Sequence, residues 1–85
     1  MNRLKFSNVS LSDFRKFLRY AGCVKVDGGD GGHEKWKKEG ARRSIIIQTH
    51  IDPVPILVVK SNLKTLELSN SYFKEWVLKG KPSKP

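Results

Sequence analysis

Residues 23–49 read CVKVDGGDGGHEKWKKEGARRSIIIQT, and this stretch decides the fold. Segments that are rich in β-branched residues, or whose side chains alternate in polarity, are separated by glycine-containing turns. This pattern predicts strands at 23–27, 33–38 and 44–49. Four of the five residues 28–32 are glycine, a composition typical of a tight or mobile turn. Glu39-Gly40 form the second turn. Because both connections are short, we expect the three strands to pair as an antiparallel meander.

A helix is predicted before the first strand. Ser10 is placed to act as its N-cap, and Asp13 three positions later makes a weak version of a capping box. Gly22 is a good residue to end the helix. Apolar residues recur at helical spacing between these points, namely Leu11, Phe14, Phe17, Leu18 and Ala21.

Two more helices are predicted after the strands. Ile56, Val59, Leu63 and Leu66 have the spacing of an amphipathic helix, which Asp52 or the residues just after it would cap, with a proline in the first turn. Val58-Val59 leaves a short strand before Ser61 open as an alternative. A last short helix is expected to begin at Ser69, to carry Phe73, Trp76 and Val77 on its core face, and to end at Gly80.

The order of these elements predicts an α+β fold. A three-stranded antiparallel sheet with helices on one face makes a small two-layer sandwich, and this layout resembles the double-stranded-RNA-binding domain. With 85 residues we expect one domain at 1–80 and a polar, disordered tail at 81–85. The residues predicted to form the core are Phe14, Leu18, Ile45, Ile47, Leu63 and Trp76.

The composition points to a polyanionic partner. Lysine and arginine total 17 against 8 acidic residues, a net charge of +9, which favours nucleic acid first, an acidic protein second and an anionic membrane third. The single cysteine, Cys23, excludes an internal disulfide and a cysteine-based metal site. Neither a signal peptide nor an apolar run of ~18 residues is evident, so the expected location is the cytoplasm.

His33 is the residue best placed for chemistry. It follows the glycine run directly, where a strand begins and the side chain is accessible. Alternation along a strand places His33, Lys35 and Lys37 on one face, and Glu34, Trp36 and Lys38 on the other, where Trp36 is expected to pack against a helix. An imidazole beside ammonium groups suits metal-free RNA cleavage, in which a base activates the 2′-hydroxyl and cations stabilise the charge that develops. A plain surface histidine is the alternative.

Other residues with reactive side chains give less direct indications. His50, at the end of the third strand, is a second candidate proton carrier if the second and third strands pair. Two histidines, one cysteine and scattered acidic residues do not form a convincing metal site, and no cofactor is expected. The glycine run lacks the GxxxxGK[ST] pattern of a phosphate-binding loop and does not lead into a helix.

The basic residues form two groups that we predict to bind RNA. One group surrounds the second hairpin and consists of Lys35, Lys37, Lys38, Arg42 and Arg43. The other lies on the first helix and consists of Arg15, Lys16 and Arg19. In RNA-binding sandwiches of this layout a helix and a hairpin grip the backbone together.

Three segments of the chain resemble the HicA toxins of bacterial toxin–antitoxin systems. They are Ala21-Gly22-Cys23, then Gly32-His33-Glu34-Lys35-Trp36, then Ile47-Gln48-Thr49-His50-Ile51-Asp52-Pro53-Val54-Pro55. The resemblance runs from about Leu11 to Trp76. Many family members have Gly-Ser-His where this chain has Gly31-Gly32-His33.

The resemblance implies a specific activity. It implies a ribosome-independent endoribonuclease that cleaves mRNA with His33 as the catalytic residue, and neutralisation by a HicB-type antitoxin protein. Two alternatives remain open from the residues alone. One is a double-stranded-RNA-binding module without catalysis, and the other is a protein whose basic face docks an acidic partner.

Overall fold

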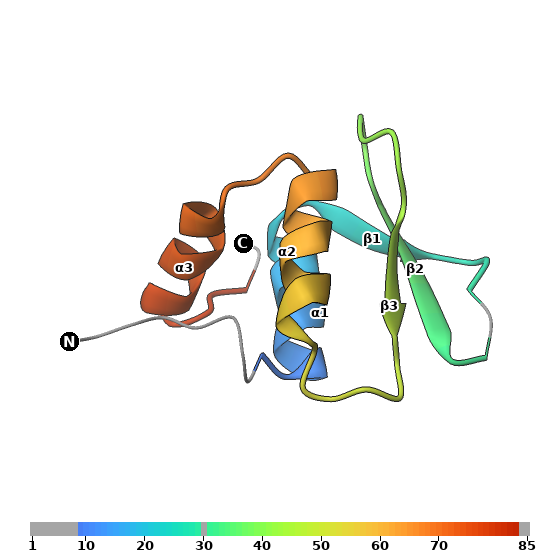
Figure 1. Cartoon of the computed structure of the whole chain (residues 1–85). Helices are drawn as coiled ribbons and strands as arrows, with labels where there is room; N and C mark the ends of the chain where they lie inside the picture. Colours follow the sequence, from blue (N-terminus) through green and yellow to red (C-terminus); the bar gives the residue numbers. More distant parts are fainter. Residues whose placement is uncertain (1–8, 30, 84–85) are drawn as a thin grey trace.

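The computed structural model describes residues 9–29 and 31–83 (Figure 1). Asp30 of the glycine-rich turn and residues 84–85 of the expected tail lie outside this part. The described elements are α1 (Leu11–Tyr20), β1 (Cys23–Val26), β2 (His33–Lys38), β3 (Ile45–Gln48), α2 (Ile56–Thr65) and α3 (Asn70–Leu78). The predicted α+β order is confirmed, and Val58-Val59 belong to α2, so the alternative of a short strand there is wrong.

The three strands form one antiparallel sheet in the order β1-β2-β3, with β2 in the centre. The register places Trp36 in one row with Lys25 of β1 and Ile45 of β3. Lys35 lies in the adjacent row, with Val26 of β1 and Ile46 of β3. Because side chains alternate along a strand, the Trp36 row and the Lys35 row lie on opposite faces. Trp36 and Ile45 are fully buried while Ile46 is 47% exposed, so one face of the sheet is covered and the other is open.

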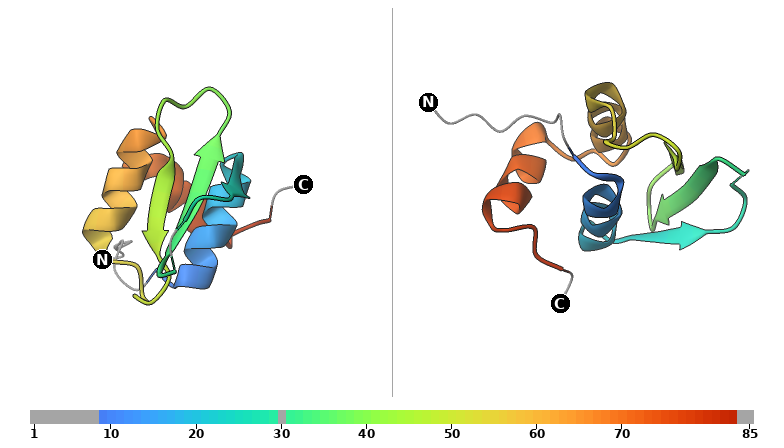
Figure 2. Two further views of the ribbon diagram at one scale, coloured as in Figure 1. Left: turned by 90° about the vertical axis from the view of Figure 1, so that its right-hand side faces the viewer. Right: turned by 90° about the horizontal axis from the view of Figure 1, so that it is seen from below.

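The helices lie in two layers on the covered side of the sheet. Figures 1 and 2 show α1 and α2 against the sheet, with α3 on the far side of them. The ring of Phe17 on α1 contacts the rings of Phe73 and Trp76 on α3, at centroid distances of 4.8 and 5.2 Å. The helices are therefore on one side of the sheet as predicted, and α3 adds an outer layer through contacts with α1.

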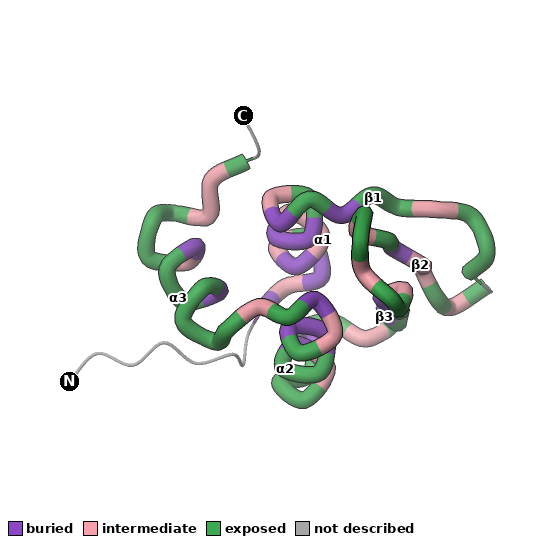
Figure 3. The backbone as a smooth tube through the Cα atoms, turned by 90° about the horizontal axis from the view of Figure 1, so that it is seen from above, coloured by how far each residue is buried: buried purple, intermediate pink, exposed green. Residues whose placement is uncertain are grey.

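The core lies between the sheet and the helices. In Figure 3 the buried residues lie on the sides of the helices and strands that face one another. All six residues predicted for the core are at most 1% exposed, namely Phe14, Leu18, Ile45, Ile47, Leu63 and Trp76. Burial of a large apolar side chain stabilises a fold by about 1.5–3 kcal/mol. The amphipathic spacing therefore predicted the buried faces correctly.

The ends of α1 show one confirmed and one unexpected contact. Ser10 Oγ accepts a hydrogen bond from the backbone N–H of Asp13 at 2.9 Å, as an N-cap should. Asp52, which we expected to cap α2, instead accepts from the backbone N–H of Leu11 at 2.9 Å. The α2 N-cap is Pro55, without a side-chain hydrogen bond. The loop after β3 therefore fixes the start of α1.

The first residues of the expected tail contact the domain. Lys81 Nζ lies 2.8 Å from Asp13 Oδ2 on α1, and the indole N–H of Trp76 donates to the Pro82 carbonyl at 3.0 Å. The chain after α3 is thus held against α1 as far as Pro82.

Candidate active site

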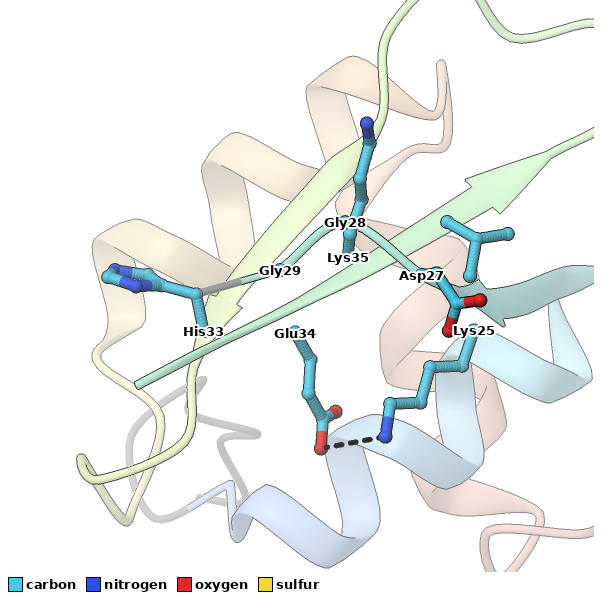
Figure 4. A pocket seen from close by; sticks show the side chains of 8 residues that line it. Lys25, Asp27, Gly28, Gly29, His33, Glu34 and Lys35 are labelled. Atoms are coloured by element: carbon cyan, nitrogen blue, oxygen red, sulfur yellow. Dashed lines mark ion pairs between the residues drawn. The ribbon is translucent and has the colours of Figure 1, made fainter. Parts of the chain in front are cut away.

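A pocket of about 190 Å³ opens at the end of the β1–β2 hairpin. It is lined by the end of β1, the glycines that follow it and the first three residues of β2, including His33 and Lys35. We call it the His33 pocket. Figure 4 shows Lys35 and Glu34 leaving β2 in opposite directions, with the His33 imidazole pointing away from both.

Glycines allow the hairpin loop to close on the His33 pocket. A Cβ at Gly29 would lie 2.5 Å from the carbonyl oxygen of His33, a distance that no side chain tolerates. Gly28 has φ +116°, and a Cβ there would lie 3.4 Å from Cδ of Lys35. Gly28 and Gly29 are therefore required by close packing, which brings the Lys35 side chain and the loop backbone together.

His33 is exposed at the first position of β2. Its neighbour across the sheet is Gln48 of β3. Among the described residues, no protein group forms a hydrogen bond with its imidazole. Both ring nitrogens are therefore available to a ligand that enters the His33 pocket.

His50 lies close to the start of β2. A Cβ at Gly32 would be 3.2 Å from His50 Nδ1, and the Gly32 carbonyl accepts from the backbone N–H of Thr49 at 2.9 Å. Since successive residues of a strand project to opposite faces, His50 faces Gly32 on the side away from the His33 ring. Pairing of β2 with β3 thus brings the two histidines near one another along the backbone, and a proton-carrying role for His50 stays a prediction.

Glu34 anchors the His33 end of β2 to α1. Arg15 donates two hydrogen bonds to its carboxylate, from Nε at 3.1 Å and from Nη2 at 2.7 Å. The Trp36 indole donates a third at 3.1 Å, and Lys25 Nζ lies 3.8 Å away. The hydrogen bonds from Arg15 are the main reason that the pKa of Glu34 is lowered, with burial acting in the opposite direction.

The two arginines that we predicted to bind RNA from α1 are engaged within the protein. Arg15 is held by Glu34, and the Arg19 guanidinium lies 5.2 Å from the centre of the Trp36 ring, a cation–π distance. Lys16 lines a separate hollow of about 390 Å³ with Arg19, Ser12 and Ser83. None of the three residues lines the His33 pocket, although Arg15 contacts its lining residue Glu34.

Of the remaining predicted RNA-binding residues, Lys38, Arg42 and Arg43 lie at or beyond the other end of β2. Five residue steps separate His33 from Lys38, which is about 17 Å along a strand. Beyond Lys38, the loop between β2 and β3 and the end of α2 line a cleft of about 490 Å³, which we call the arginine cleft. Its lining residues are Arg42, Arg43, Ser61, Lys64, Thr65 and Glu67.

Lysines connect these two ends across the open face of the sheet. Lys35 and Lys37 both lie on that face, where their neighbours on β1 are Val26 and Val24. The only carboxylate within the three strands, Glu34, faces α1 instead. The open face is thus a strip of cations and apolar side chains without an acidic residue in its strands.

Sequence reasoning did not identify two basic residues of these sites. Lys25 lines the His33 pocket, and Lys64 lines the arginine cleft. Lys25 comes from the neighbouring strand and Lys64 from a helix far along the chain. Alternation in β1 would have placed Lys25 beside Glu34, whereas nothing local in the sequence places Lys64 near Arg42 and Arg43.

Within residues 9–29 and 31–83, no three side chains of His, Cys, Asp or Glu are grouped so that they would hold a metal ion. None of the described helices is long and apolar enough to cross a membrane. Comparisons with family models, with curated proteins and with solved structures find no match to this chain.

Proposed function

We propose that this protein is a metal-independent endoribonuclease that cleaves mRNA at the His33 pocket. The observation that carries the proposal is that one small pocket is lined by the exposed His33, by Lys35 and by a closely approaching glycine loop. Such a set supplies a proton carrier, a cation for a phosphate and a backbone that a ligand can approach closely.

The proposed reaction is an intramolecular transesterification at one phosphodiester of the RNA. His33 takes the proton of a 2′-hydroxyl, and the oxygen forms a bond to the adjacent phosphorus while the bond to the 5′ oxygen breaks. Lys35 stabilises the negative charge that builds up on the phosphoryl oxygens. The proton then passes from His33 to the departing 5′ oxygen, directly or through a water molecule. The products are a 2′,3′-cyclic phosphate and a 5′-hydroxyl.

The wider role that we propose is that of a HicA-type toxin acting in the cytoplasm. Its support is the quoted resemblance around His33 and His50, together with the +9 charge. The partner in this proposal is a HicB-type antitoxin protein that covers the site. Coexpression tests this role. The wild type alone should arrest growth, and the antitoxin encoded beside it should restore growth.

Purified protein and a defined single-stranded RNA test the chemistry. Cleavage should persist in EDTA and leave 2′,3′-cyclic phosphate ends. The variant Lys35→Gln should slow cleavage more than Lys79→Gln, a control at the C-cap of the outer helix α3. Loss of all cleavage in EDTA, or products with 3′-hydroxyl ends, would contradict the proposed reaction.

A second function is favoured by one observation. No described protein group orients the His33 imidazole through a hydrogen bond, whereas catalytic bases are commonly held by a third group. A non-catalytic RNA-binding module would have the same basic strip without that requirement. This alternative predicts salt-dependent RNA binding with no cleavage, and binding unaffected by His33→Ala.

A further inference from the structure

The cations of the arginine cleft differ from Arg15 and Lys81, on and beside α1, in having no ion-pair partner among the described residues. Arg15 and Lys81 form ion pairs, and Arg19 lies over Trp36. By contrast, no carboxylate among the described residues forms an ion pair with Arg42, Arg43 or Lys64. Glu67 also lines the cleft without an ion pair to any of the three. The cleft therefore presents three cations that form no ion pair within the described part of the chain, against one carboxylate in its lining.

The shape and donors of the arginine cleft suit a chain of phosphates. Its volume of about 490 Å³ is more than twice that of the His33 pocket, at about 190 Å³. Arginine guanidinium groups bind phosphate oxygens in a forked geometry, and the Ser61 and Thr65 hydroxyls add neutral donors. A neighbouring hollow of about 210 Å³ separates the cleft from the end of β2 and is lined by Lys38 together with Glu39 and Glu67, so the positive charge is concentrated in the cleft itself.

The cleft and the His33 pocket lie at opposite ends of one strand. The distance along β2 is about 17 Å, and Lys37 lies on the open face between the two ends. A stacked nucleic-acid strand advances ~3.4 Å per nucleotide, so about five nucleotides span this distance. Because the cleft lies beyond Lys38, between the β2–β3 loop and the end of α2, a single RNA strand of more than about five nucleotides can contact both sites.

We propose that the arginine cleft binds the phosphodiester backbone of single-stranded RNA more than about five nucleotides from the bond held at His33. This inference rests on the proposed function for the identity of the ligand as RNA. A single strand fits better than a duplex because attack by a 2′-hydroxyl needs that oxygen in line with the departing 5′ oxygen. The regular A-form helix holds the two groups out of line. The cleft would then make the enzyme selective for RNA long enough to reach both sites.

Binding to RNA that cannot be cleaved tests the inference separately from catalysis. The probes are 2′-O-methyl single strands of about four and about twelve nucleotides, a difference chosen to exceed the expected span. The full chain is compared with Arg43→Gln/Lys64→Gln in the cleft and with a control, Lys74→Gln/Lys79→Gln, on the outer helix α3 and at its C-cap. Both double variants remove the same charge, and thermal unfolding shows that both remain folded.

The cleft variant should bind the longer strand on the order of 10-fold more weakly than the control variant does. The slope of log affinity against log salt should fall by about 1.4, which is ~0.7 for each of two phosphates. The loss should be smaller for the shorter strand, which cannot contact the cleft and the His33 pocket together. Equal losses in the two variants would overturn the cleft as a site, and tighter binding of a duplex than of the single strand would overturn the choice of a single strand.

Cleavage of the matching unmodified RNA separates the two proposals. If the wild type binds through the cleft but does not cleave, the cleft stands and the proposed nuclease function fails. If the wild type cleaves and the cleft variant binds and cleaves strands of both lengths equally well, the function stands and the cleft proposal fails.

Discussion

Arg15 on α1 and Glu34 on β2 form a two-point ion pair across the core edge, 19 residues apart in the chain. Their side chains are 30% and 13% exposed, so the pair is largely shielded from water. Glu34 is next to His33, and Arg15 is on the first helix. The ion pair therefore holds the start of β2, where His33 lies, against α1.

A double-mutant cycle measures how strongly this pair holds the strand. Arg15→Met and Glu34→Gln should each destabilise the fold by roughly 1–3 kcal/mol, because each leaves a partly buried charged or polar group without its partner. The double variant should lose less than the sum of the two single losses. Urea unfolding gives the four free energies, and strict additivity would show that the pair does not couple α1 to β2.

The same ion pair predicts a pH dependence of stability. The pKa of Glu34 is lowered in the folded protein from its ordinary value of 4.5. A lowered folded pKa means that the stabilisation is complete above the unfolded pKa and is lost as pH falls through the folded one. The stability advantage of wild type over Glu34→Gln should therefore be constant above about pH 5 and shrink at lower pH. An advantage that grows on acidification would contradict the assigned shift.

Gly29 and Gly31 provide a matched test of the loop that closes the His33 pocket. Gly29→Ala should force the loop away from the His33 carbonyl, which a Cβ would approach to 2.5 Å, whereas a Cβ at Gly31 meets nothing within 4 Å. We expect Gly29→Ala to cost about 1–3 kcal/mol of stability and to lower RNA cleavage. Gly31→Ala should leave both nearly unchanged. Equal behaviour of the two variants would show that the loop does not depend on this close contact.

Ile45 and Ile46 test the register of the sheet with one residue type. Ile45 is fully buried and Ile46 is 47% exposed. Ile45→Ala should cost roughly 2–5 kcal/mol, and Ile46→Ala should change stability far less. Thermal or urea unfolding distinguishes them. A larger loss from Ile46→Ala would mean that β3 is shifted by one residue relative to β2.

The isoleucine run also shows what could be predicted from sequence. Three consecutive β-branched residues predicted a strand, and the surrounding glycine turns predicted its neighbours. Residues such as Phe14 and Leu18 were assigned to the core because helical periodicity is a local property. The Ser10 cap was predictable for the same reason, since its contact with Asp13 spans one helical turn.

The contacts that the sequence did not predict join distant segments. Asp52 reaches back 41 residues to Leu11, whereas the local pattern placed it at the start of the following helix. Lys64 meets Arg42 and Arg43 only after α2 packs beside the sheet. The predicted basic group on α1 was reasonable by charge alone, but a residue's ion-pair partner depends on what packs opposite it.

The most direct test of the central proposal is the rate at which purified His33→Ala cleaves a defined single-stranded RNA, measured beside the wild type. General acid–base catalysis contributes about 10²–10⁴-fold, so the variant should be slower by about that factor. Its affinity for the uncleavable 2′-O-methyl strand should remain that of the wild type. A variant that cleaves as fast as the wild type, with the same product ends, would contradict the assignment of His33 as the proton carrier.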